Sequence, residues 1–189
     1  MPNQVMRLVA IAMLLAIPLA TNGSQAVDRS MPPRVEASAG GFTIRSLTGP
    51  VTIDGKAWIA VGPIFSTGTV RAPNGQFAIT LAEASSVEVV HFRITFAEGG
   101  RPPVQIDSGT AVYAYISPDS RWIINGTLEF TDVRNWQKYS LSKAFNIEPF
   151  VVLKAISSDG RRLFISQQDC AFDCRNFPNK YYEITFPTR

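Results

Sequence analysis

The chain has 189 residues, of which 46% are apolar and 17% charged, and it contains two cysteines and one histidine. This length fits one domain, and the apolar fraction is that of a globular protein. The net charge of +3 is too balanced to indicate a nucleic-acid partner. The few histidine and cysteine ligands exclude a zinc module, so we expect no metal site and no cofactor.

Residues 1–26 have the features of a secretory signal peptide. Arg7 is the only charge before Asp28, and the apolar run Leu8–Ala20 is shorter than the ~20 residues that span a bilayer. Ser24-Gln25-Ala26 supplies small residues for cleavage after Ala26. An uncleaved anchor is the alternative. We expect a mature protein that is secreted, periplasmic or at the cell surface, with no membrane span after cleavage.

Residues 27–41 are rich in proline, serine and glycine, which predicts a flexible linker. Beyond them, short runs of β-branched and aromatic residues alternate with turn residues such as Asp-Gly and Asn-Gly. The expected strands are 42–47, 51–53, 57–61, 68–72, 76–81, 87–96, 104–106, 111–116, 121–131, 150–156, 162–166 and 181–186. We therefore predict that residues 42–189 form a single all-β domain, a mostly antiparallel β-sandwich of about ten or eleven short strands.

Side-chain alternation along a strand predicts which residues are buried. In the run 87–96 the expected core residues are Val90, Phe92, Ile94 and Phe96. The run 121–131 is ambiguous, because Asn125-Gly126 is typical of a two-residue hairpin turn. Such a turn would pair Trp122 with Glu129 and mix the two faces. We therefore predict a continuous strand that buries Trp122, Ile124, Leu128 and Phe130.

The two cysteines, Cys170 and Cys174, are close enough in sequence to close a small ring. A redox pair is more often Cys-x-x-Cys, and no histidine lies nearby to complete a metal site. In an exported protein this spacing favours a structural disulfide.

Catalytic motifs are absent from the sequence. His91 is the only imidazole, and no G-x-S-x-G nucleophile motif occurs. Two carboxylates across a cleft would be enough for a glycosidase. The candidate carboxylates are scattered through loops and strand ends: Asp107, Asp119, Glu129, Asp132 and Glu148.

Four aromatic residues are candidates for ligand binding. Trp136 and Tyr139 lie in a polar segment, where they would stack on a sugar ring or close the end of the core. Tyr113 and Tyr115 share one face of the run 111–116, which is either core or an exposed platform. Asn125-Gly126-Thr127 is also a formal N-glycosylation sequon.

One stretch of the chain resembles a known family. Asp54-Gly55, the apolar run 57–61, the segment Thr69–Phe77 (TVRAPNGQF) and the long run Val87–Phe96 follow one another. This order resembles the carboxypeptidase-regulatory or transthyretin-like β-sandwich domains over residues 42–106. The resemblance implies a non-catalytic accessory or adhesive module.

These observations favour a secreted, non-catalytic β-sandwich module that binds a surface partner, either a polysaccharide or a protein. The alternative is a secreted hydrolase that acts through a pair of carboxylates.

Overall fold

The computed structural model describes residues 27–188 except 37, 63, 66, 86–89, 110–112, 148–150 and 168–178. The expected signal peptide, both cysteines and Glu148 therefore lie outside the described residues. For His91 only the backbone is described. The disulfide and the signal peptide stay predictions.

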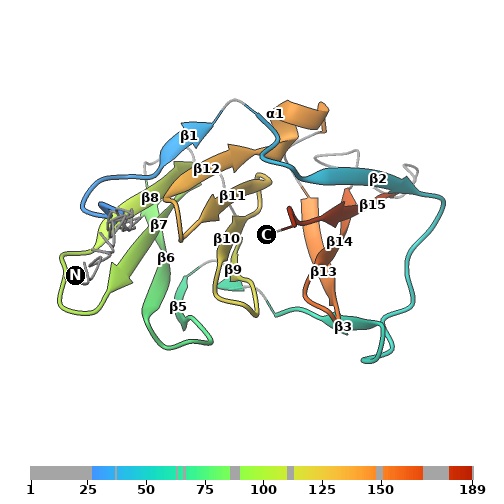
Figure 1. The fold of residues 1–189 in the computed structure, drawn as a ribbon, viewed down its shortest axis with the longest axis horizontal. Coiled ribbons are helices and arrows are strands. Elements are labelled where there is room, and N and C mark those ends of the chain that lie inside the picture. Colours follow the sequence, from blue (N-terminus) through green and yellow to red (C-terminus); the bar gives the residue numbers. More distant parts are fainter. Residues whose placement is uncertain are drawn as a thin grey trace, which may run out of the picture.

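The described residues form fifteen strands and one short helix, arranged in three sheets (Figure 1). Sheet A has the order β1 (Arg34–Glu36), β12 (Gln137–Ser140), β11 (Glu129–Asp132), β10 (Trp122–Asn125), β9 (Tyr113–Ile116) and β4 (Ile64–Phe65). Sheet B has the order β2 (Thr43–Leu47), β15 (Lys180–Thr185), β14 (Arg162–Gln167), β13 (Val151–Ser157) and β3 (Trp58–Ala60). Sheet C consists of β5 (Gly68–Arg71), β6 (Phe77–Ser85), β7 (Val90–Glu98) and β8 (Val104–Gly109), and the helix α1 is Leu141–Phe145.

Antiparallel pairing dominates, which confirms the predicted fold class. Among the described strands only β1 and β12 pair in parallel. The number of strands exceeds the expectation because the run 121–131 is divided by a turn and because β1, β4 and β12 lie where no strand was predicted. The Asn74-Gly75 and Asp159-Gly160 turns close the β5–β6 and β13–β14 hairpins, with Gly75 and Gly160 at φ +72° and +69°.

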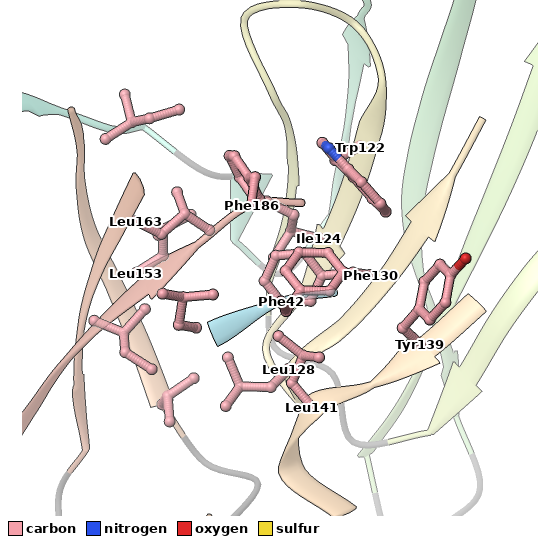
Figure 2. Packing of buried hydrophobic residues seen from close by; sticks show 14 of the residues in the cluster. Phe42, Trp122, Ile124, Leu128, Phe130, Tyr139, Leu141, Leu153, Leu163 and Phe186 are labelled. Carbon is pink, nitrogen blue, oxygen red and sulfur yellow. The ribbon is translucent and has the colours of Figure 1, made fainter. Parts of the chain in front are cut away.

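Sheet A is the middle layer and is buried on both faces. On one face Trp122, Ile124 and Phe130 pack against sheet B in a first core cluster (Figure 2). On the other face Ile116 and Ile123 pack against sheet C in a second cluster. A strand that is buried on both faces has a continuous apolar run rather than an alternating one. The run Trp122-Ile123-Ile124 of β10 is such a run.

Most of the predicted core residues are buried. Phe42 packs against the rings of both Trp122 and Phe130 (Figure 2), with ring centroids 4.9 and 4.8 Å away. Leu128 and Ile124 are at most 1% exposed, and Ile94 and Phe96 are buried in the second cluster. Phe92 is only half-buried, and the side chain of Val90 is not described.

The prediction of a continuous strand over 121–131 is wrong. β10 and β11 form a hairpin with Ile124 opposite Phe130 and Trp122 opposite Asp132. The loop holds three residues, 126–128, so even-numbered residues still face the same side and the faces do not mix. Leu128 takes the left-handed conformation at φ +58°, and Asn125 Oδ1 accepts hydrogen bonds from the backbone N–H groups of Thr127 and Glu129.

The N-terminal segment also differs from its expectation as part of a flexible linker. Arg29 donates from Nε and Nη2 to the carbonyl oxygen of Val133 and forms an ion pair of 2.6 Å with Glu98. The indole Nε1 of Trp136 donates to the carbonyl oxygen of Met31, and Arg34–Glu36 then forms β1 at the edge of sheet A. The segment is therefore held to the domain by these hydrogen bonds and by strand pairing, although Met31 and Val35 are exposed.

Candidate functional site

The four aromatic candidates do not form an exposed strip. Tyr113, Trp136 and Tyr139 are 1%, 5% and 8% exposed, and Tyr115 is half-buried against the first core cluster. The ring of Trp136 lies 4.8 Å from that of Phe96. Burial raises the pKa of Tyr115 to about 12. These side chains stabilise the core on both faces of sheet A.

A cleft of about 650 Å³ lies elsewhere, at one end of the layer between sheets A and B. We call it the end cleft. It opens between the β9–β10 turn and the β13–β14 turn, beside β3 and the residues that follow β15. Its lining is Ile59, Pro118, Asp119, Arg121, Trp122, Ile156, Ser157, Ser158, Asp159, Gly160, Arg161, Phe186 and Pro187.

The first wall of the cleft is a tightly bonded turn. Ser117 Oγ donates to Asp119 Oδ1 at 2.6 Å and accepts from the backbone N–H of Trp122. Asp119 Oδ1 also accepts from the N–H of Arg121, and Ser120 has a positive φ of +57°. The β9–β10 turn is thus fixed by side-chain hydrogen bonds as well as by strand pairing.

The second wall repeats this arrangement. Ser157 Oγ donates to Asp159 Oδ1 at 2.5 Å and accepts from the N–H of Arg162, while Asp159 Oδ1 accepts from the N–H of Arg161. The hydroxyl of Ser157 and the N–H of Arg161 stabilise the carboxylate, so the pKa of Asp159 is lowered. Gly160 takes the positive φ that Ser120 takes in the first turn.

The two walls of the end cleft share a sequence pattern that the known catalytic motifs do not include. Ser117-Pro118-Asp119-Ser120-Arg121 and Ser157-Ser158-Asp159-Gly160-Arg161 share the pattern Ser-x-Asp-x-Arg at corresponding positions. In each turn the serine hydroxyl donates to the aspartate, and both side chains accept hydrogen bonds from backbone N–H groups. The pattern alone does not show that the two turns lie at one cleft, because that follows from the pairing of the strands.

The floor of the cleft is apolar and its rim is mixed. Trp122, Ile156 and Phe186 are buried, with the rings of Trp122 and Phe186 stacked at 6.0 Å. Ile59 lines the cleft and is 43% exposed. Arg161 also lines the cleft and is exposed. A floor of apolar groups with a few polar groups at the rim is typical of binding sites.

Arg121 is the fixed cation of the end cleft. Its Nε and Nη2 donate to Asp132 Oδ2 at 2.9 and 2.8 Å, and its guanidinium lies 4.4 Å from the ring centre of Trp122. Asp132 is 2% exposed. Asp132, one of the candidate carboxylates, therefore orients Arg121 from inside the fold.

The outer edge of β3 is partly closed to strand addition. The N–H of Trp58 donates to Asp54 Oδ1, and its carbonyl oxygen accepts from the N–H of Gly55. The Asp54-Gly55 turn therefore occupies the groups that an added strand would need. A partner at this end of the domain would contact side chains rather than the β3 backbone.

Two candidate carboxylates, Asp107 and Glu129, do come together. They lie between sheets A and C, with the Nζ of Lys138 at 3.4 Å from Asp107 Oδ1 and 3.2 Å from Glu129 Oε2. The Nδ2 of Asn125 donates to Asp107 Oδ2 and to Glu129 Oε2. Burial raises the pKa of Asp107, and the positive charge of Lys138 opposes that shift. We call these four residues the polar quartet.

The polar quartet also bears on the glycosylation sequon. Asn125 is 3% exposed, and its Nδ2, the atom to which a glycan attaches, donates to the two carboxylates. The folded chain therefore offers no acceptor nitrogen at this sequon.

No family model, no curated protein and no solved structure matches the chain. The resemblance to transthyretin-like domains accordingly stays a prediction. No helix in the described part of the chain is long and apolar enough to cross a membrane. Within the same residues, no group of three or more histidine, cysteine or acidic side chains is arranged to hold a metal ion.

Proposed function

We propose that this protein is an exported, non-catalytic module that binds a surface protein through the end cleft. The observation that carries the proposal is the composition of that cleft: an apolar floor, an exposed isoleucine and two arginines between two rigid turns. Because the turns are fixed by internal hydrogen bonds, little conformational entropy is lost on binding.

A protein partner suits this cleft better than a polysaccharide. Sugar binding generally relies on an exposed aromatic ring, and the aromatic residues that line the cleft, Trp122 and Phe186, are only 2% and 8% exposed. Arginine is enriched where proteins meet proteins. Arg121 and Arg161 both line the cleft, together with the exposed Ile59.

The alternative of a hydrolase with two carboxylates has weaker support. A glycosidase needs room for the scissile bond between its carboxyl groups. Between Asp107 and Glu129 that space holds the ammonium of Lys138 and the amide of Asn125. Asp119 and Asp159 do line the end cleft, but each is an acceptor in its own turn.

Two screens of the immobilised mature protein test the proposal. One uses a phage-displayed random peptide library, and the other uses a glycan array. We expect peptides to be enriched on the wild type and lost on Ile59→Asp, with Arg71→Glu on sheet C as the matched surface control. Binding to glycans alone would replace the protein partner by a polysaccharide, and enrichment on neither screen would contradict a binding module.

A further inference from the structure

The polar quartet places an amine, two carboxyl groups and an amide within reach of one another inside the fold. Asn125 and Lys138 are 3% and 9% exposed, and the side chains of Asp107 and Glu129 are 15% and 24% exposed. The residues come from two layers: Asp107 belongs to β8 of sheet C, and the other three belong to sheet A. A bond between Asp107 and Lys138 would join the layers.

Each member of the quartet is placed for one part of amide formation. The Nζ of Lys138 lies 3.4 Å from a carboxyl oxygen of Asp107, so the amine is in contact with the carboxyl group that it would attack. Glu129 Oε2 lies 3.2 Å from the same nitrogen and can accept its proton. Asn125 Nδ2 donates to the other oxygen of Asp107, where negative charge would develop during attack.

We propose that Lys138 and Asp107 form an amide bond between their side chains, which covalently joins β12 of sheet A to β8 of sheet C. The protonated carboxyl group of Asp107 is the electrophile, and burial favours that neutral form. Lys138 passes a proton to Glu129, and the neutral amine attacks Cγ of Asp107. The Asp107 hydroxyl then leaves as water with the proton held by Glu129, and Glu129 takes the second proton from the nitrogen, so that a neutral amide and a protonated Glu129 remain. One C–N bond forms, one C–O bond breaks, and no oxidant or cofactor is needed.

The fold holds the two reacting groups in contact, whereas free side chains in water are not held together. Two side chains fixed in contact have effective concentrations of about 10⁵–10⁸ M in favourable cases. The bond also removes two charges from an environment in which desolvation is costly. Its effect would resemble that of a disulfide, since it restricts the unfolded chain between residues far apart in sequence.

Intact-mass analysis of the purified, reduced mature protein tests the proposal. The wild type should be lighter than its sequence by the mass of one water. Lys138→Arg keeps the positive charge but is not expected to form this amide, so it should have its full sequence mass. Glu129→Gln should also have its full mass, whereas Lys154→Arg, an exposed substitution on β13, should lose water as the wild type does.

Trypsin digestion locates the bond. Cleavage after Lys138 should be blocked, and residues 94–121 should be recovered joined to residues 135–143 as one branched peptide. A wild type with its full sequence mass overturns the proposal. Loss of ammonia instead of water also overturns it, because the electrophile would then be Asn125.

Discussion

Asp132 and Arg121 form a two-hydrogen-bond ion pair at the base of the end cleft, with Nε and Nη2 at 2.9 and 2.8 Å from Oδ2. Asp132 is 2% exposed and the Arg121 side chain 14%, so water screens little of the attraction. The pair connects the β9–β10 turn to β11. It therefore couples the wall of the candidate site to the stability of sheet A.

Substitution of this aspartate tests the coupling. Asp132→Asn leaves the Arg121 guanidinium largely buried and without its counter-charge, so the free energy of unfolding should fall by about 3–5 kcal/mol. Urea denaturation measures this change. Glu83→Gln, an exposed substitution on β6, should stay within about 0.5 kcal/mol of the wild type. A loss below about 1 kcal/mol for Asp132→Asn would show that the pair is not stabilising.

Gly40 offers a test of how the N-terminal segment packs on sheet A. A Cβ at this position would overlap Cε1 of Tyr139, and the residue has a φ of +59°. Gly40→Ala should therefore lower the free energy of unfolding by more than the ~1–2 kcal/mol of a left-handed alanine alone. Gly55→Ala separates the two contributions, because Gly55 has a φ of +71° with open space around it. Equal losses in the two variants would place Tyr139 away from Gly40.

The pH dependence of the β13–β14 turn follows from Asp159. The pKa of Asp159 in the folded chain lies below its ordinary value, because the Ser157 hydroxyl and the N–H of Arg161 donate to the carboxylate. Between the pKa of the folded chain and that of the unfolded chain, the unfolded chain binds more protons at Asp159. The carboxylate therefore stabilises the fold above about pH 4 and loses that effect as the pH falls.

Asp159→Asn keeps an acceptor oxygen but removes the titration, as Asn74 does in the β5–β6 turn. The stability difference between wild type and this variant should shrink from pH 6 to pH 2, measured by urea denaturation. A difference that is the same at both pH values would contradict the assignment.

The sequence predicted the class of the fold because turn chemistry is local. Asn74-Gly75 and Asp159-Gly160 supply the positive φ that their hairpins need, whatever surrounds them. The sequence did not predict that sheet A is covered on both faces. Tyr113 and Tyr115 alternate with apolar residues that face a second core, so alternation alone left their side undetermined.

Long-range contacts explain the other differences between the expected and the observed structure. Trp136 has polar neighbours because it lies in the β11–β12 turn, yet its ring points inward at a positive φ of +56° and its indole nitrogen binds Met31. The bond from Arg29 to Val133 spans 104 positions and turns a proline-rich segment into part of the domain. The end cleft likewise joins Ile59 to Phe186, which no local pattern connects.

The central claim is that the end cleft is a binding site, and isothermal titration tests it most directly. The probe is a synthetic peptide selected on the wild type, titrated against wild type, Arg161→Glu and Arg71→Glu. Arg161 lines the cleft, whereas Arg71 lies on sheet C. The account predicts at least about tenfold weaker binding for Arg161→Glu, or ~1.4 kcal/mol, and wild-type affinity for Arg71→Glu. Equal affinity for all three proteins would contradict it.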